Sequence, residues 1–178
     1  MIVECLQRHL AVCAVADLPS FTKRDPKFWN VISLLGPQTP NPVKVNFRDH
    51  HRAHFDDVAD AKAGTGATIV NAATMRAVLK FVDDRPGQPI LVHCVMGISR
   101  SPAAALVLLL RGLISSGEER PAQAAVETLL TIRPIARPNP LVLEIGLQCF
   151  LSEGDAKHTT NQVMERLRFL GSASSESA

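Results

Sequence analysis

A cysteine and an arginine six residues apart, Cys94 and Arg100, lie in the stretch PILVHCVMGISRSP at residues 89–102. A thiolate is a strong nucleophile, and a guanidinium can bind two oxygens of one phosphate group. Gly97 lies between them and lets the loop curl, so that successive backbone N–H groups turn toward an anion. These residue types at this spacing predict a loop that binds a phosphate group above a nucleophilic thiol.

The residues on either side of this loop have the patterns of a strand and a helix. The apolar run at residues 90–93 predicts a buried strand, and Ser101 followed by Pro102 is a cap and first-turn pair with which helices begin. A helix N-terminus leaves backbone N–H groups unpaired, and its dipole favours negative charge. We therefore expect an anion site in which the thiolate of Cys94 is stabilised and can attack phosphorus.

Other segments have the periodicity of strands or helices. Apolar and β-branched runs predict strands at residues 2–6, 29–35 and 90–93, with weaker candidates at 43–47 and 53–55. Helical patterns cover residues 71–82, the stretch that begins at 101, and residues 121–131 and 141–151. Strands mixed with helices in this order predict an α/β fold with a mostly parallel central sheet and a final group of helices on one side of it.

Length and composition favour one globular domain. The chain has 178 residues, 46% of them hydrophobic, and a formal net charge of +2, which is too small to suggest a nucleic-acid partner. We expect a single domain over residues 1–170 and a flexible tail, GSASSESA, over 171–178. Four cysteines without a CxxC pair indicate reduced thiols, and the longest apolar run is too short to cross a bilayer. The expectation is a cytoplasmic monomer with no membrane contact.

The stretch VHCVMGISRS resembles the signature of the cysteine-dependent protein tyrosine phosphatases, HCxxGxxR followed by Ser or Thr. Its GISRS form is most similar to the dual-specificity group. The later stretch IRPIARPNPLVL resembles the RP…PN segment of that group, and the likeness extends more loosely over residues 29–151. The resemblance implies a three-layer α/β/α fold, a phosphocysteine intermediate, and neither a metal nor another cofactor.

The resemblance also implies a role for each matching residue. Cys94 would be the nucleophile, Arg100 would bind the phosphate, and the Ser101 hydroxyl would assist departure of the thiolate in the second step. His93 would orient the loop and help to lower the thiol pKa, and Asn139 would hold the loop or the attacking water. The expected backbone N–H donors to the phosphate are those of Val95, Met96, Gly97, Ile98 and Ser99.

The leaving group needs a proton, which a carboxylic acid on a neighbouring loop can supply. In the dual-specificity group this acid is an Asp that follows an extended segment upstream of the cysteine. The stretch RAHFDDVAD offers Asp56, Asp57 and Asp60. Its order of an apolar residue, an acidic residue and then Asp favours Asp57, with Asp56 and Asp60 as the alternatives.

Three further interpretations compete with a phosphoprotein phosphatase. A pseudophosphatase would bind a phosphorylated partner without turnover, but such binders commonly lack one of Cys94, Arg100 and Ser101. A phosphatase could instead act on a small, non-protein phosphate ester, although the uncharged pair Val95 and Met96 disfavours a phosphoinositide. An arsenate reductase or a rhodanese-like enzyme is disfavoured because the loop lies in the middle of the chain.

The histidines upstream of the acidic stretch could suggest a metal site. His50, His51 and His54 lie near Asp56, but the segment has no second set of ligands and its pattern is that of an extended or loop segment. We expect these side chains to lie on a solvated rim near the phosphate loop.

Overall fold

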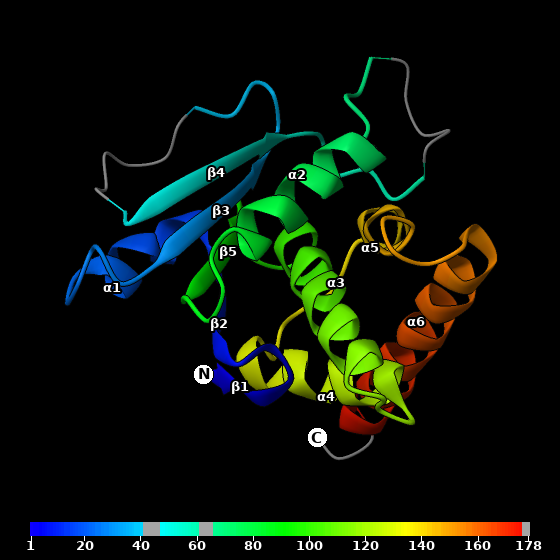
Figure 1. Cartoon of the computed structure of the whole chain (residues 1–178). Coiled ribbons are helices and arrows are strands. Elements are labelled where there is room, and N and C mark those ends of the chain that lie inside the picture. Colours follow the sequence, from blue (N-terminus) through cyan, green and yellow to red (C-terminus); the bar gives the residue numbers. More distant parts are fainter. Residues whose placement is uncertain (41–46, 61–65, 176–178) are drawn as a thin grey trace.

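The computed structural model describes residues 1–40, 47–60 and 66–175 (Figure 1). Five strands form a sheet in the order β1-β2-β5-β3-β4. β1 is antiparallel to β2, and the three other neighbouring pairs are parallel. The predicted mostly parallel sheet is therefore confirmed. The strands are β1 (Ile2–Val3), β2 (Arg8–Ala14), β3 (Asn30–Leu35), β4 (Asp49–His54) and β5 (Ile90–Cys94).

Helices cover the two faces of the sheet unevenly. Residues from α2 to α6 share one apolar core with one face of the sheet, whereas the short α1 and several aromatic side chains cover the other face (Figure 1). The predicted α/β fold is confirmed, with one thick and one thin helical layer. The helices are α1 (Leu18–Thr22), α2 (Ala72–Asp83), α3 (Arg100–Ser115), α4 (Pro121–Ile132), α5 (Pro140–Leu147) and α6 (Glu153–Ser175).

The helix α3 is central to the larger core. Every residue from 100 to 110 is buried, because the sheet lies on one side of the helix and α4 and α5 pack on its other sides. This explains why its sequence is apolar nearly all round instead of amphipathic. Burial on every side fixes the start of α3, and with it the loop that connects β5 to the helix.

The strand β2 was not among the predicted strands. Its sequence begins with the polar pair Arg8 and His9, so the apolar pattern covers only part of it. The predicted strand at residues 2–6 extends only over Ile2–Val3, because the chain then turns back through Gln7 at φ 50° into β2. β2 nevertheless lies beside β5, in a register that pairs Ala14 with Cys94.

The edge strand β4 is more polar than a typical strand. The weaker candidate at residues 53–55 corresponds to its end, whereas the candidate at 43–47 lies outside the described residues except for Phe47, which is not in a strand. Alternate side chains of β4 face opposite sides of the sheet. His50 contacts Ser33 and the ring of Phe47, while His51 packs on Phe81 of α2.

The long helix α6 was also not predicted. Its sequence contains few apolar residues, but Ala156 and Val163 are buried in the main core, against which α6 packs beside α4 and α5. Tertiary packing thus stabilises a helix with a weak periodic signal. The helix continues to Ser175, so the expected boundary between domain and tail at residue 171 falls inside it.

Candidate active site

The candidate active site lies at the carboxyl ends of the parallel strands. Cys94 is the last residue of β5 and Arg100 is the first residue of α3, so the loop between them connects a buried strand directly to a buried helix. Ser99 is the N-cap residue, and the helix begins one residue before the predicted Ser101. The sequence thus predicted the strand, the loop and the helix at nearly their observed positions.

Each backbone carbonyl from Val95 to Ser99 accepts a hydrogen bond from outside the loop. The C=O and the following N–H of a trans peptide point in opposite directions. The N–H groups of residues 96–100 therefore face the inner side of the loop, where an anion would bind. The donors, in order along the loop, are Val15 N at 3.1 Å, Arg133 Nη2 at 3.2 Å, Arg133 Nε at 3.1 Å, Arg137 N at 2.7 Å and Asn139 N at 3.2 Å.

Gly97 is required at its position in this loop. Its φ of +66° lies in the left-handed region, and a Cβ atom there would lie 2.5 Å from the carbonyl carbon of Cys13. No side chain can be placed at that distance from a backbone atom, so only glycine lets the loop pass this close to the end of β2.

The thiol of Cys94 lies inside this ring of N–H groups. Its Sγ accepts hydrogen bonds from the Gly97 N–H and the Ser101 hydroxyl, both at 3.2 Å. Burial raises the pKa of Cys94, but the hydrogen bonds from the Ser101 side chain and from the backbone of Ser101, Gly97 and Ser99 outweigh it, so the pKa is lowered overall. The loop therefore favours the nucleophilic thiolate.

His93 lies beneath the loop and is fully buried. Its Nε2 lies 2.5 Å from the hydroxyl of Ser33, and that hydroxyl lies 2.7 Å from Nε2 of His50. Burial lowers the pKa of His93 to about 4, and nearby His50 adds to this, while the Cys94 backbone opposes it. His93 is therefore neutral near pH 7 and carries no positive charge that could lower the thiol pKa. Ser33 was not predicted as a site residue. The sequence signal for it is a polar residue within the otherwise apolar run of β3.

The guanidinium of Arg100 makes a hydrogen bond through one nitrogen and leaves another nitrogen, Nε, without one in the part of the chain that the structure describes. Its Nη1 donates to the carbonyl of Phe55 at 2.8 Å, which fixes the plane of the group. Its Nε is buried and has no hydrogen-bond partner among the described residues. The carboxylate of Asp57 lies 3.6 Å from this Nε, too far for a hydrogen bond, and buried N–H groups are nearly always hydrogen-bonded in folded proteins. The donor therefore fits an anion that binds in the loop.

Asp57 is the predicted acid that lies at the phosphate loop. One carboxylate oxygen accepts hydrogen bonds from the Ser99 hydroxyl at 2.6 Å and the Asn139 amide at 2.8 Å, and the other lies 3.6 Å from Arg100 Nε. Asp56 instead accepts from the backbone N–H of Thr68 at 2.9 Å. Asp57 therefore contacts the loop directly, whereas the described hydrogen bond of the Asp56 side chain is with Thr68.

Asn139 joins the later segment of the chain to the acid. Its amide nitrogen donates to Asp57 and to the carbonyl of Val58, while its amide oxygen accepts from Val142 N and caps α5. The side chain is buried and uses all three contacts to hold a fixed orientation. Asn139 therefore positions Asp57, a contact that the resemblance did not specify.

The other three cysteines do not pair with Cys94, although Cys13 lies on the neighbouring strand β2, opposite His93. Cys13 and Cys94 belong to the cores on opposite faces of the sheet, so their side chains cannot meet without rearrangement of the strands. Burial, with a smaller contribution from Asp17, raises the pKa of Cys13 to about 12, and burial also raises the pKa of Cys5 and Cys149. All four cysteines are free thiols.

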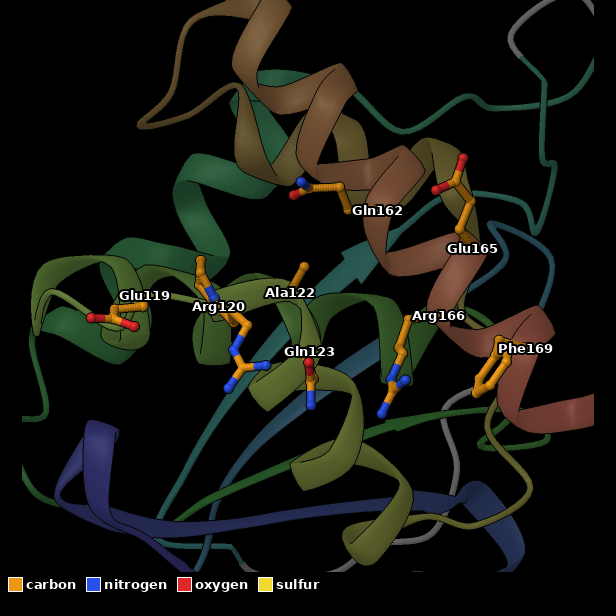
Figure 2. Close-up of a pocket in the computed structure, with 9 residues that line it drawn as sticks. Glu119, Arg120, Ala122, Gln123, Gln162, Glu165, Arg166 and Phe169 are labelled. Carbon is orange, nitrogen blue, oxygen red and sulfur yellow. The ribbon is translucent and has the colours of Figure 1, made fainter. Parts of the chain in front are cut away.

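A cavity of about 440 Å³ lies elsewhere, between the start of α4 and α6. Figure 2 shows Arg120, Gln123 and Arg166 around it, and none of the phosphate-loop residues lines it. Arg166 is paired with Glu127 at 2.9 Å. Within residues 1–40, 47–60 and 66–175, no three His, Cys, Asp or Glu side chains are grouped so that they could hold a metal ion, and no helix has the length and apolar character needed to span a bilayer.

Comparison with known proteins gives structural neighbours but no sequence relatives. No family model and no curated protein sequence matches the chain. The DUSP15 structure superposes with a TM-score of 0.59 at 18% identity, covering 93% of this chain and 94% of that one. The structure of the Cydia pomonella PTP-2 phosphatase superposes with a TM-score of 0.56 at 20% identity, covering 86% of this chain and 92% of that one. The structure of human DUSP28 superposes with a TM-score of 0.54 at 19% identity, covering 94% of this chain and 93% of that one.

These neighbours match nearly the whole chain and are all phosphatases by name. At such identities the likeness concerns the fold, which agrees with the resemblance inferred from the loop sequence. This chain has the fold of the cysteine-dependent protein tyrosine phosphatase superfamily, in its dual-specificity-like form.

Proposed function

We propose that this protein is a phosphomonoester hydrolase that acts through a phosphocysteine intermediate on Cys94. One observation carries the proposal: the thiol of Cys94 lies within inward-facing N–H groups beside Arg100, whose buried Nε has no hydrogen-bond partner among the described residues and lies 3.6 Å from the carboxylate of Asp57. A phosphate group supplies the oxygens that these donors need. The same donors would stabilise the charge that develops on the three equatorial oxygens during transfer.

In the first step, the Cys94 thiolate forms a bond to phosphorus while the bond to the leaving oxygen breaks. Asp57 gives its proton to that oxygen, so the product departs as an alcohol or phenol. A bound phosphate would compete with Asp57 for Arg100, which lies 3.6 Å from the carboxylate.

In the second step, water attacks the phosphorus and gives a proton to Asp57, while the bond between sulfur and phosphorus breaks. Cys94 leaves as a thiolate, which accepts the hydrogen bond from the Ser101 hydroxyl at 3.2 Å. The products are inorganic phosphate and the enzyme in its starting form. No residue outside the described site has to supply or remove a proton.

Exposed apolar side chains around the loop support a substrate with an apolar surface next to its phosphate. Val95, Met96 and Ile135 are 37%, 62% and 53% exposed, and they are three of the six large hydrophobic side chains that are exposed in the part of the chain that the structure describes. Apolar side chains that are grouped on an exposed surface often belong to a binding site. We therefore favour a phosphorylated protein segment, and phosphotyrosine in particular offers an apolar ring beside the phosphate.

A phosphorylated lipid or small ester is the second candidate. One structural neighbour, PTPMT1, was solved in complex with PI(5)P, at a TM-score of 0.51 and 16% identity over 89% of this chain. A headgroup with several phosphates would need additional cations around the loop, whereas Val95 and Met96 are uncharged. The proposal also includes a reducing, cytoplasmic location, because the mechanism needs Cys94 as a free thiolate.

Hydrolysis of para-nitrophenyl phosphate, with a metal chelator present, tests the proposed activity. We expect turnover by the wild type, its loss in Cys94→Ser, and severe impairment in Arg100→Ala. A well-folded wild type that binds orthovanadate without turning over any phosphomonoester would instead indicate a phosphate-binding pseudophosphatase. One neighbour, named a human tyrosine phosphatase-like serine/threonine/tyrosine-interacting protein, has the same fold at a TM-score of 0.51.

A further inference from the structure

The guanidinium of Arg133 contacts three groups on two different segments. Its Nε and Nη2 donate to the carbonyls of Gly97 and Met96, and its Nη1 lies 3.6 Å from the carboxylate of Asp17. Arg133 follows the end of α4 and begins the loop that leads to Asn139. Its side chain is only 21% exposed, so the guanidinium lies mostly between the phosphate loop and the end of β2.

The contacts of Arg133 differ in kind from the other contacts to the loop. Backbone N–H groups hold the carbonyls of Val95, Ile98 and Ser99, and almost any residue can supply a backbone N–H. Among the described residues, the carbonyls of Met96 and Gly97 are the two of these five that a side chain holds. Arg133 therefore helps to set the orientation of the two following peptide N–H groups, those of Gly97 and Ile98, the first of which also donates to Cys94 Sγ.

Asp17 completes the support on the other side. Its carboxylate accepts a hydrogen bond from Ala14 N at 3.3 Å and faces Arg133, so the guanidinium is held at both ends. A planar guanidinium can meet two carbonyls and a carboxylate at once, because its five N–H groups point in fixed directions. A lysine ammonium at the same position is a compact point charge and cannot span the same three groups.

We propose that Arg133 is a positioning residue, which holds the Met96 and Gly97 carbonyls outward and so keeps the next two N–H groups directed at the phosphate. The inference rests on the proposed phosphatase function. Arg133 acts from the outer side of the loop, through carbonyls that point away from the anion site, and its hydrogen bonds do not include the thiol of Cys94. Its loss should weaken the binding of the equatorial oxygens and thereby the stabilisation of the transition state.

Binding of orthovanadate, measured by titration calorimetry, tests this role in Arg133→Ala and Arg133→Lys. Hydrogen bonds that involve charged groups are stronger than those between neutral groups, so we expect affinity and kcat to fall by roughly tenfold or more. Arg166→Ala is the matched control, because Arg166 is a similarly buried arginine in an ion pair with Glu127, on a face that contains none of the loop residues. This control should bind vanadate and turn over substrate like the wild type.

Comparison of Arg133→Ala with Arg133→Lys distinguishes a loss of loop positioning from a loss of positive charge and from a failure to fold. Arg133→Lys keeps the positive charge, so it should fold even if Arg133→Ala does not, and it should still bind vanadate weakly. The amide resonance of Gly97 should shift on vanadate binding in the wild type and much less in Arg133→Lys. Wild-type affinity, turnover and Gly97 shift in folded Arg133→Lys would overturn the proposal. A wild type that neither hydrolyses phosphomonoesters nor binds vanadate would refute the proposed function itself, and the role of Arg133 with it.

Discussion

The side-chain amide of Asn139 donates a hydrogen bond of 2.8 Å to the carboxylate of Asp57, although the two residues are 82 positions apart in the sequence. This contact links the loop before α5 to the segment after β4. It also places the carboxylate beside Ser99 and Arg100. The position of the proposed general acid, Asp57, thus depends on a residue that is distant in the sequence but adjacent in space.

Asp57→Ala should lower kcat far more than Asp56→Ala. Loss of a general acid costs about 10²–10⁴ in rate, and Asp57 is the acid that contacts the loop. Asp56 holds the backbone of Thr68, so its loss should affect stability more than chemistry. The check is steady-state hydrolysis of an alkyl phosphate, whose poor leaving group needs the acid most. A larger loss in Asp56→Ala would assign the role to Asp56 instead.

Asn139 has two functions that different substitutions should separate. Asn139→Ala removes the cap of α5, which should cost about 0.5–2 kcal/mol of stability, and it also releases Asp57. Asn139→Asp keeps an acceptor for Val142 N but brings a second carboxylate against Asp57. Turnover should therefore fall in both variants, and denaturant unfolding should show a loss of stability in Asn139→Asp although the cap is kept, because the new carboxylate is buried against Asp57 and the Val58 carbonyl. Normal turnover in Asn139→Asp would show that the contact with Asp57 has no role in catalysis.

The reactivity of Cys94 should show a thiol pKa below its ordinary value of 9.0. Alkylation by iodoacetamide, followed against pH, measures this value, and Ser101→Ala should move the midpoint upward because the Ser101 hydroxyl donates to the thiolate. Mass spectrometry should find one modified residue near neutral pH, since the pKa values of the other three cysteines are raised. An unchanged midpoint in Ser101→Ala would exclude this hydrogen bond as a cause.

The same lowered pKa makes the stability of the fold depend on pH. Because the folded thiol ionises below the unfolded thiol, its contribution to the free energy of unfolding is fully present above pH 9.0. That contribution is lost as the pH falls through the folded pKa. The difference in unfolding free energy between wild type and Cys94→Ser should therefore change in favour of the wild type as pH rises. A difference that is independent of pH would contradict a lowered thiol pKa.

Gly97→Ala should damage the site much more than Gly117→Ala. Both glycines have positive φ, at +66° and +77°, so each substitution carries the cost of about 1–2 kcal/mol for a left-handed residue. Only at Gly97 would the new Cβ meet backbone atoms, those of Cys13 and Ala14, whereas nothing lies within 4 Å at Gly117. The two variants are compared by thermal unfolding, which measures stability, and by vanadate binding, which measures the state of the loop. Equal losses of stability with intact vanadate binding in Gly97→Ala would show that the loop can adjust.

The sequence predicted the loop from Cys94 to Arg100, the strand before it and the helix after it at nearly their observed positions, because strong local signals coincide there. An apolar strand, a glycine with positive φ and a helix start lie within a few residues of each other, and the structure brings Cys94, Ser101 and Arg100 together as expected. The strand β2 was missed because the polar Arg8 and His9 open it, and its place beside β5 depends on pairing with a distant strand. Local patterns do not record such pairing.

The supporting residues could be predicted only in part. Asp57 was favoured from a short pattern, but its contact with Asn139 depends on how two distant loops pack. Arg133 carries no signal of its own that distinguishes it from a surface arginine, and its hydrogen bonds to the loop carbonyls appear only in three dimensions. The help that His93 was expected to give in lowering the thiol pKa is not among the causes of the lowered Cys94 pKa, because burial keeps the His93 ring neutral, and burial depends on the whole fold.

The most direct test of the central claim is detection of the covalent intermediate. Wild-type protein is mixed with para-nitrophenyl phosphate, quenched rapidly, digested and examined by mass spectrometry. The account predicts one phosphoryl group on Cys94, present in the wild type and absent in Cys94→Ser. Turnover that proceeds with phosphate on another residue, or that survives in Cys94→Ser, would contradict the phosphocysteine mechanism.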